Sequence, residues 1–560
     1  MKGYRLISWV IVIAFIITFI LFLTLSYEEC IRYISIFSGY NKTDKIASLL
    51  TLKKFNLMRF LPLLGIFMGV TMLLFQKGIY EAIVLSARWI RNTYTLILEQ
   101  LLQYSPNEFL ILMGILLINL VVKGYLAVMF TITYDEAWTY INFTSRGIVS
   151  SMSYYPAPNN HIFHSILTNI FSAIPIHETI ALRLPSVIAN TFLVFLFYIF
   201  TRRLTNEKIA VLLTFVFSFL VPVLYYGFTA RGYSLLLMFF TVAYFMVLRL
   251  LESEKNVKRN LFYFSIASIL GFYTMPSFLY PYITLNLFLL IVAIKKQQRK
   301  IIISSIVGMA VTTVAVLILY MPVFLISGPA SVFSNSYVTP IGRGAVLMKL
   351  LPHYNQTFEY LFNFPFATVP ALAITVLACF KSERKLLAYF NAWIVGFALI
   401  IPILHSVIPF TRTWIYLIIP VLISLGLVLE PFLYGHKRKV AVRLAGAVLA
   451  LLLSLVSYRA ILHQDDYAIK AQQADEFLLN HYVFSIYIDE PLMDTYVIYT
   501  YKINKLNLDC YIHKEDYIAK AKEIEMLLYK AGTTPQGVTA APIYSNEYFS
   551  IYRNPLYSSN

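Results

Sequence analysis

The sequence of 560 residues is 59% hydrophobic and only 13% charged, and its mean hydropathy is +0.70. A soluble domain is typically about 25% charged, so this chain lacks the charge to cover a water-facing surface. The three cysteines, Cys30, Cys379 and Cys510, have neither the spacing of a metal site nor that of a disulfide framework. The composition therefore predicts a polytopic membrane protein and excludes a disordered chain and a secreted disulfide scaffold.

The net charge of +17 would also suit a nucleic-acid-binding protein, so the position of the charge along the chain matters. From Arg459 to Asn560 there are nine basic and thirteen acidic residues, so the positive excess belongs to the hydrophobic part of the chain. Basic residues in the loops of a hydrophobic chain are what the positive-inside rule predicts. We therefore expect membrane lipid, and no nucleic acid, as a partner.

Hydrophobic segments long enough to cross a bilayer recur along the chain. A membrane-spanning helix needs about 20 apolar residues, within a range of roughly 17–25. Two further segments are not predicted to cross the bilayer. Segment 76–105 has the pattern of an amphipathic helix on the membrane surface, and segment 160–178 is predicted to be a short apolar helix that dips into or lies on the outer surface. The pattern predicts an all-α polytopic membrane protein with about 13 transmembrane helices, at 6–26, 57–75, 109–131, 185–201, 209–225, 233–250, 261–276, 278–294, 301–320, 366–380, 386–404, 414–433 and 440–458.

The connections between the spans differ in charge from residue 202 onward. One alternate set carries only four basic residues, Arg231, Arg343, Lys349 and Arg412. The other set carries Arg202, Arg203, Lys208, Arg249, Lys255, Lys258, Arg259, Lys295, Lys296, Arg299, Lys300, Lys381, Arg384, Lys385, Lys437, Arg438, Lys439 and Arg443. The richer set should be cytoplasmic, which puts the N-terminus in the cytoplasm of a multi-pass inner (plasma) membrane protein. The basic connection 27–56 departs from this rule.

The tail from residue 459 changes character. Helical patterns at 467–481 and 514–530 alternate with strand-like runs at Val483–Ile488 and Tyr496–Tyr501. These runs predict a small α/β domain on the outer side of the membrane. We therefore expect an N-terminal extra region with the amphipathic helix (1–108), a transmembrane core (109–458) and an extracytoplasmic C-terminal domain (459–560).

Two polar clusters lie at the outer ends of the predicted spans. Asp135 and Glu136 follow the span 109–131 directly, and Asn160 and His161 open the short apolar segment. Paired carboxylates at a membrane surface suit acid–base chemistry. The structural alternatives are a solvated loop start for the carboxylates and a helix cap for the asparagine.

A third cluster consists of arginines on the side where basic residues are scarce. Arg231 lies in the run Ala230-Arg231-Gly232-Tyr233, and Arg412 lies between two threonines. A guanidinium group binds phosphate with two parallel hydrogen bonds, so these arginines are candidates for holding a phosphate. The alternative is that they reach to the membrane interface as ordinary snorkelling side chains.

The order of these clusters resembles the GT-C glycosyltransferases of the protein mannosyltransferase and aminoarabinose transferase type (glycosyltransferase 39/83-like). The resemblance covers about residues 109–430. Many members of that family carry prolines where this chain has Ile162-Phe163. The motifs that carry the resemblance are the Asp135-Glu136 loop, Arg183-Leu184-Pro185-Ser186, the double arginine Arg202-Arg203, the Arg231 turn and the Arg412 segment.

The resemblance implies a GT-C-like fold and transfer of a sugar from a polyprenyl-phosphate donor to a lipid, glycan or protein acceptor on the outer face. It makes Asp135 the general base, and Glu136 a residue that orients the acceptor or holds Asp135. The residues expected to bind substrate are Asn160, His161, Arg231, Tyr233, Arg343 and Arg412, with Arg183 anchoring the end of its span.

No cofactor and no metal is required by this scheme, although Asp135, Glu136 and His161 could instead assemble a divalent metal site. The outer connection 321–365, which contains Arg343 and His353, is longer than ordinary loops of about 4–6 residues. We hypothesise that it covers the active site and gates the entry of a substrate.

Three other functions stay open from the sequence. A transporter of lipid-linked saccharides would be expected to have helix breaks and polar residues at mid-membrane depth. The polar clusters of this chain are instead predicted at the membrane interface. An O-antigen-ligase or polymerase-like enzyme would use a late outer loop, here 321–365 with Arg343 and His353. A non-catalytic scaffold with an outer sensor domain would leave the Asp-Glu pair without a role.

Overall fold

The computed structural model describes residues 2–38, 46–47, 50–334, 339–433, 452, 455–461 and 466–558. The chain divides into two compact units. The N-terminal unit contains Met1–Leu110, Ser153–Pro156 and Tyr320–Phe333, and the core unit contains Ile111–Met152, Ala157–Leu319 and Ser334–Asn560.

In the N-terminal unit, α1 (Lys2–Thr24) packs along α5 (Leu61–Leu74). Gly65 and Gly69 of α5 lie directly against the side chains of Phe15 and Val12, so the two helices approach more closely than larger residues would allow. The expected amphipathic helix is α6 (Gln76–Leu102), which is bent by 91° from α5. Two shorter helices complete this unit, α2 (Tyr27–Ser38) and α4 (Leu52–Met58).

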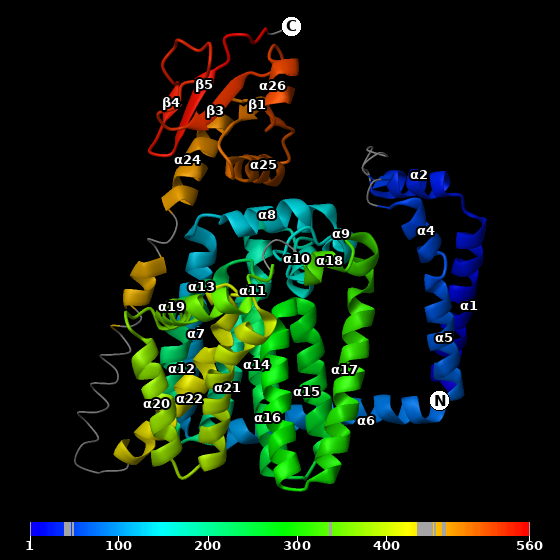
Figure 1. The fold of residues 1–560 in the computed structure, drawn as a ribbon, viewed down its shortest axis with the longest axis vertical. Coiled ribbons are helices and arrows are strands. Elements are labelled where there is room, and N and C mark those ends of the chain that lie inside the picture. The colour runs from blue at the N-terminus through cyan, green and yellow to red at the C-terminus, as the bar shows by residue number, and fades with distance from the viewer. Residues whose placement is uncertain are drawn as a thin grey trace. The chain divides into compact units, whose positions relative to one another are not determined.

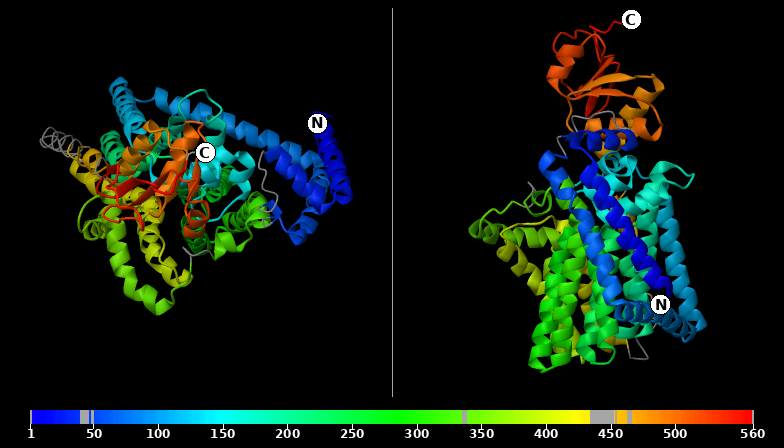
Figure 2. Two further views of the ribbon diagram at one scale, coloured as in Figure 1. Left: turned by 90° about the horizontal axis from the view of Figure 1, so that it is seen from above. Right: turned by 90° about the vertical axis from the view of Figure 1, so that its right-hand side faces the viewer.

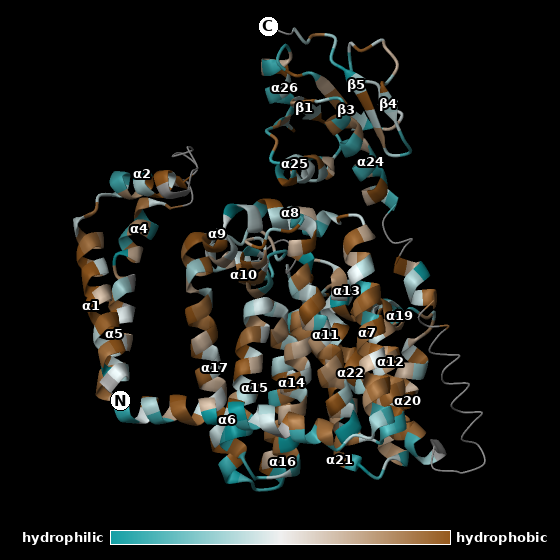
Figure 3. Ribbon diagram, turned by 180° about the vertical axis from the view of Figure 1, so that it is seen from behind, coloured by the Kyte–Doolittle hydropathy of each residue, from teal (hydrophilic) through white to brown (hydrophobic). Residues whose placement is uncertain are grey.

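The described helices confirm a multi-pass membrane protein. Eight of them are long and apolar enough to cross a membrane, and the number rises to ten if each of two bent pairs is one span. Figure 3 shows these helices as mainly hydrophobic, whereas hydrophilic residues are frequent in the C-terminal domain. The span expected at 440–458 lies largely outside the described residues.

The core unit places its helices side by side in one bundle (Figures 1 and 2). Its membrane-side helices are α7 (Pro106–Met129, which begins in the N-terminal unit), α11 (Glu178–Leu204), α12 (Glu207–Phe219), α13 (Val221–Phe228), α14 (Tyr233–Glu252), α15 (Val257–Thr274), α16 (Leu279–Lys295), α17 (Arg299–Ile326), α20 (Thr368–Lys381), α21 (Lys385–His405) and α22 (Ile418–Leu429). Shorter elements lie between them: α8 (Tyr134–Asn142), η1 (Thr144–Arg146), α9 (Ile148–Ser153), α10 (Ile162–Phe171), η2 (Pro276–Phe278), η3 (Thr411–Leu417) and η4 (Glu430–Leu433).

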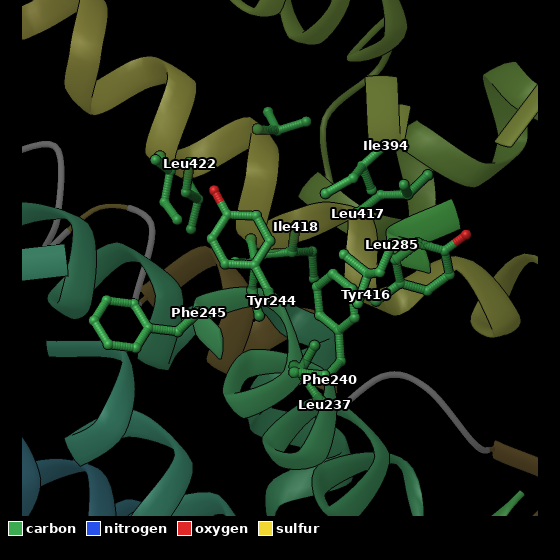
Figure 4. Packing of buried hydrophobic residues seen from close by; sticks show 14 of the residues in the cluster. Leu237, Phe240, Tyr244, Phe245, Leu285, Ile394, Tyr416, Leu417, Ile418 and Leu422 are labelled. Carbon is green, nitrogen blue, oxygen red and sulfur yellow. The ribbon is translucent and has the colours of Figure 1, made fainter. Parts of the chain in front are cut away.

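Aromatic side chains fill the centre of the bundle. Phe240, Tyr244 and Tyr416 lie together in Figure 4, among leucines and isoleucines of α14, α16, α21 and α22. The Tyr244 hydroxyl donates to Asn391 Oδ1 at 2.6 Å, and Asn391 Nδ2 donates to Ser424 Oγ at 3.1 Å. Because these polar groups are buried and bonded, they fix the relative positions of three helices. The bundle therefore holds the side chains at its ends in fixed positions.

The tail forms the expected small α/β domain. Its five strands lie in the order β2-β1-β3-β5-β4, with β1, β2 and β3 parallel and β5 antiparallel to β3. The strands are β1 (Ser485–Ile488), β2 (Asp509–Tyr511), β3 (Met526–Lys530), β4 (Tyr544–Ser545) and β5 (Phe549–Arg553), and the helices are α24 (Asp466–Asn480), α25 (Met493–Ile503) and α26 (Lys514–Lys520).

Two expectations about the tail are wrong. Tyr496–Tyr501 is not a strand but part of α25, because Met493, Val497 and Tyr501 recur every four residues and are buried in the core of the domain. The helix expected at 514–530 ends at Lys520, since Met526–Lys530 pairs with two other strands as β3. In both segments, packing against the sheet overrides local propensity.

The connection expected as a long loop at 321–365 is mainly helical. The helix α17 continues to Ile326, α18 covers Ala330–Phe333, and α19 covers Arg343–Phe362. The helix α19 packs on η3, where the Trp414 indole N–H donates to His353 Nε2 at 3.1 Å. The long apolar and aromatic side chains on one face of this segment favour such packing over an open loop.

Candidate active site

The two adjacent carboxylates begin the short helix α8. Thr133 is its N-cap: the Thr133 hydroxyl accepts from the Glu136 N–H at 3.4 Å, and Glu136 Oε2 accepts from the Thr133 N–H at 3.0 Å. This reciprocal capping box satisfies two backbone donors at once. It places Asp135 and Glu136 in the first turn, where the helix dipole favours negative charge.

Glu136 is completely buried and is paired with the equally buried Arg183 of α11. Arg183 Nε donates to Oε1 at 2.9 Å and Nη2 donates to Oε2 at 2.8 Å, while the Ala230 N–H also donates to Oε1, at 2.6 Å. Burial alone would raise the pKa of Glu136, but Arg183 and the backbone N–H groups of Ala230 and Thr133 lower it below its usual value. The remaining guanidinium N–H groups donate to the carbonyls of Ala127, Phe130 and Thr131.

Both oxygens of Glu136 are therefore occupied by the protein. Of the two roles expected for this residue, holding Asp135 in place fits the geometry, and orienting an acceptor does not. The divalent metal alternative fits poorly for the same reason, because Glu136 has no oxygen left to offer a metal ion. Within the described ranges, no three His, Cys, Asp or Glu side chains are grouped to hold a metal.

Asp135 differs from its neighbour because its side chain is 36% exposed. Its Oδ2 atom lies 3.5 Å from Arg231 Nη2 and 3.9 Å from Arg412 Nη1. The carboxylate thus lies between two arginines that come from turns far apart in the sequence, and it remains accessible from outside. The structure brings together Asp135, Arg231 and Arg412, three of the charged residues that the sequence singled out.

Arg231 is held tightly, with 4% of its side chain exposed. Its Nη1 group donates to Thr139 Oγ1 at 3.1 Å and to the Asn159 carbonyl at 3.3 Å. Its Nε is buried and has no hydrogen-bond partner in the described part of the chain. A buried donor without a partner is expensive, so this arginine is suited to receive an anion.

His161 adds a neutral donor beside Arg231. The His161 Nδ1 atom accepts from the Gly232 N–H at 2.8 Å, so the proton of the neutral ring is on Nε2, which lies 3.3 Å from Arg231 Nη2. Burial, and then the charge of Arg231, lowers the pKa of His161 well below its usual value. Two N–H donors therefore face each other, an arrangement that an anionic oxygen between them would stabilise.

Arg412 lies among tyrosines. Its guanidinium is 4.6 Å from the centre of the Phe410 ring, and it interacts electrostatically with Tyr233. Tyr233 packs against Tyr226 with ring centres 4.1 Å apart, and the Tyr360 hydroxyl donates to the Tyr226 hydroxyl at 3.1 Å. Tyr233 is thus placed at the cluster as expected. Tyr360, which comes from α19, was missed because no local motif marks it.

Two residues expected to bind substrate show no side-chain hydrogen bond or ion pair to Asp135 or its two arginines in the described part of the chain. Asn160 is buried, with Nδ2 donating to the Ser151 carbonyl and Oδ1 accepting from the Ser165 hydroxyl, both at 2.9 Å. Its side chain therefore fastens the start of α10. Arg343 is exposed at the start of α19, and within the described residues no hydrogen bond or ion pair joins it to the Asp135 cluster.

A buried lysine was missed by the motif search. Lys123, inside the apolar helix α7, donates to Asn190 Oδ1 and Thr191 Oγ1, both at 2.9 Å. Asn190 in turn donates to the Val223 carbonyl at 3.0 Å and to Ser234 Oγ at 3.2 Å. This network joins α7 and α11 to the first turn of α13 and to Ser234, three residues after Arg231. A single lysine within an apolar span is itself a sign of function or of buried pairing, and could have been noticed.

No protein-family model and no curated protein matches the sequence. The chain is similar to the solved structure of ArnT from Cupriavidus metallidurans in the apo state, at 12% identity, with 80% of this chain and 99% of that chain covered and a TM-score of 0.49. It is also similar to the apo oligosaccharyltransferase of Archaeoglobus fulgidus, at 12% identity, with 75% and 69% covered and a TM-score of 0.42. The same archaeal enzyme with Zn and sulfate gives 12% identity, 74% and 68% covered, and a TM-score of 0.46.

Both of these proteins are glycosyltransferases of the GT-C fold, the class that the sequence resembles. At 12% identity and TM-scores below 0.5, the likeness by itself decides nothing about this chain. The function proposed below rests on the chain's own residues.

The two adjacent carboxylates should respond differently to removal of their charge. Glu136→Gln is expected to destabilise the protein by about 3–5 kcal/mol, because Arg183 then stays buried without its counter-charge. Asp135→Asn is the matched control and should change stability by about 1 kcal/mol, because Asp135 is 36% exposed and its two arginine contacts are long, at 3.5 and 3.9 Å. Thermal unfolding in detergent measures both. An equal loss for the two variants would contradict the structural role of Glu136.

The buried histidine His164 predicts loss of stability in mild acid. Burial, and then the charge of Arg231, lowers its pKa to about 3, whereas the unfolded chain binds a proton below about pH 6.5. Unfolding is therefore favoured as the pH falls from 6.5 towards 3. Melting temperatures between pH 7 and pH 5 should fall less in His164→Gln than in the wild type. An equally steep fall in both proteins would contradict this, and the exposed His481→Gln is the control.

Proposed function

We propose that the protein is a GT-C-type membrane glycosyltransferase, which moves a sugar from a polyprenyl-phosphate donor to an acceptor hydroxyl. The observation that carries this proposal is the accessible Asp135 carboxylate held between Arg231 and Arg412, next to helices that cross a membrane. A general base beside a phosphate-binding pair is what transfer from a phosphate-linked sugar needs. A lipid-linked donor explains why such a site lies at the ends of apolar helices.

Arg231, Arg412 and His161 would hold the donor phosphate. When the bond from the sugar carbon to the phosphate oxygen breaks, the phosphodiester becomes a phosphomonoester and gains negative charge. Fixed donors aimed at that charge lower the barrier. The Nε atoms of both arginines are buried and have no hydrogen-bond partner among the described residues, which leaves donors for the incoming oxygens. The polyprenyl chain would stay in the bilayer.

Asp135 would act on the acceptor. As the acceptor oxygen bonds to the sugar carbon, its proton passes to the Asp135 carboxylate, and the phosphate leaves with the electrons of the broken bond. The Asp135 side chain is 36% exposed, so its carboxylate can also face an acceptor hydroxyl. Displacement of the phosphate in one step inverts the configuration at the sugar carbon. A positioned general base contributes roughly 10²–10⁴-fold to such a step.

The acceptor, which could be a lipid, a glycan or a protein, would approach from the outer side. We place the protein in the inner (plasma) membrane with its N-terminus in the cytoplasm, and the site and the C-terminal domain outside. The support is the distribution of basic residues, which are scarce in the connections that carry Arg231 and Arg412.

Loss of the proposed base should stop transfer without preventing donor binding. Asp135→Asn is expected to lower kcat by at least about 100-fold, because the amide cannot take the acceptor proton. The assay follows release of polyprenyl phosphate from the lipid-linked sugars of the native membrane by reconstituted protein. Glu547→Gln, an exposed change in the C-terminal domain, is the control. Full activity of Asp135→Asn would reject the assignment.

Arg231 should determine the affinity for the phosphate. Arg231→Lys keeps the charge but loses the forked geometry, so binding of decaprenyl phosphate should weaken by roughly tenfold or more, as expected for loss of a charge-assisted hydrogen bond. Titration of the protein in nanodiscs measures this. Arg343→Lys is the matched control, because Arg343 is exposed at the start of α19. Equal affinities in all three proteins would contradict a phosphate site at Arg231.

The same two experiments separate the rival functions. An O-antigen-ligase-like enzyme that uses Arg343 and His353 would lose activity in Arg343→Lys and keep it in Asp135→Asn. A transporter of lipid-linked saccharides would bind decaprenyl phosphate without releasing it from a sugar. In the structure His353 accepts the indole N–H of Trp414, so it already serves helix packing.

A further inference from the structure

The C-terminal domain contributes to the small core that surrounds the Glu136–Arg183 pair. Tyr499 of α25 is packed there together with residues of α8, α11 and the Arg231 turn. This cluster consists of Ala137, Tyr140, Ile141, Leu182, Ala230 and Tyr499, with Ile132, Ile498 and Ile503 around it. The immediate neighbours of Glu136, Arg183 and Arg231 in the sequence are therefore packed against a residue of the outer domain.

The helix α25 has two faces. Met493, Val497 and Tyr501 point into the core of the C-terminal domain. The opposite face of α25 contacts α8 and η1. Successive residues along α25 meet successive residues along α8 and η1. Tyr496 packs edge-on against Tyr134 with ring centres 6.2 Å apart, Tyr499 packs edge-on against Tyr140 at 5.4 Å, and Lys502 Nζ donates to Ser145 Oγ at 3.0 Å.

Tyr499 closes a ring of contacts among three helices. Its hydroxyl is hydrogen-bonded to Thr179 Oγ1 at 2.7 Å, and Thr179 lies one turn before Arg183 on α11. Arg183 binds Glu136, and Glu136 lies one turn before Tyr140 on α8. Tyr140 meets the Tyr499 ring. Residues four apart share a helix face, so the ring runs from α25 to α11, to α8 and back.

This ring matters because α8 is too short to be stable alone. It has nine residues, whereas isolated helices below about 12–15 residues are marginal in water. The Glu136–Arg183 pair fixes the first turn of α8, and Tyr499 of α25 packs on Tyr140 one turn later. Asp135 belongs to the first turn of this helix, so a shift or rotation of α8 would move its carboxylate. Displacements near 1 Å can lower a rate by about 100-fold.

We propose that the C-terminal domain fixes the placement of Asp135 by clamping α8, and that Tyr499 is the positioning residue through which it does so. The proposal rests on the proposed function, since it assigns the outer domain to the same site. Burial raises the pKa of Tyr499, so the phenol keeps its proton and its hydrogen bond to Thr179 at physiological pH. Tyr499 touches neither the donor nor the acceptor and acts through α8.

Tyr499→Phe tests the proposal, because it removes the hydroxyl and keeps the ring. The matched control is Tyr501→Phe on the same helix, where the lost hydroxyl donates to the Val483 carbonyl at 2.6 Å inside the domain. Both variants lose one buried hydrogen bond, so a purely structural effect would be equal in the two. A hydrogen bond worth about 1 kcal/mol corresponds to roughly fivefold in rate or equilibrium.

The expected result is a drop in kcat of roughly fivefold or more for Tyr499→Phe, with the donor KM unchanged and Tyr501→Phe close to wild type. Hydrogen exchange of the Tyr134–Asn142 amides should likewise become roughly fivefold faster in Tyr499→Phe alone. Thr179→Val should give the same losses, and the double variant should add little to them. Equal effects of Tyr499→Phe and Tyr501→Phe on kcat, or unchanged exchange of α8 in Tyr499→Phe, would overturn the proposal.

The two proposals fail in different ways. If the wild type releases no polyprenyl phosphate from any lipid-linked sugar, the proposed function is rejected. The exchange of α8 needs no substrate, so it still decides whether Tyr499 clamps that helix.

Discussion

The buried pair of Glu136 and Arg183 is the interaction on which the Asp135 end of the core unit depends. Moving two charges out of water is costly, and the loss is offset only if every polar atom of the pair finds a partner. Here the carboxylate receives five donors, from Arg183, Ala230 and Thr133, while the guanidinium reaches three carbonyls at the end of α7. One ion pair thereby joins α7, α8, α11 and the Arg231 turn.

The neighbouring carboxylates show how burial separates two chemically similar residues. Glu136 is buried and its carboxylate is saturated by the protein, whereas Asp135 is 36% exposed and lies beside two arginines. In the proposed reaction, Glu136 would provide the position and Asp135 the reactive group. Because both belong to one helical turn, whatever fixes Glu136 also fixes Asp135. Under the proposed function, this coupling makes Glu136 necessary for the placement of Asp135, although Glu136 itself has no room for a ligand.

The arginine turn is supported by two sets of contacts. Lys123 donates to Asn190, and Asn190 donates to the Val223 carbonyl in the first turn of α13 and to Ser234 Oγ, while Gly227 leaves room for the Lys123 and Asn190 side chains. In the second set, Tyr499 packs beside Ala230. Polar groups within an apolar bundle persist only when they are bonded, so this network holds the site in one geometry.

Several features follow from the sequence alone. Composition and span length predict a multi-pass membrane protein, and the charge pattern predicts which loops face the cytoplasm. The positions of Asp135, Arg231 and Arg412 at outer span ends also follow, because each is a local property of its own segment. The structure confirms the membrane class and the small α/β tail, and it brings these three residues together.

The tertiary structure alone decides the rest. It decides that Glu136 is buried while Asp135 is partly exposed, that the Asn160 side chain bonds to Ser151 and Ser165, and that Tyr360 and Tyr499 pack near the arginine turn. It also turns the strand-like run Tyr496–Tyr501 into part of a helix. The reason is that burial, ion pairing and sheet pairing depend on partners from distant segments, and those partners exist only once the chain has folded.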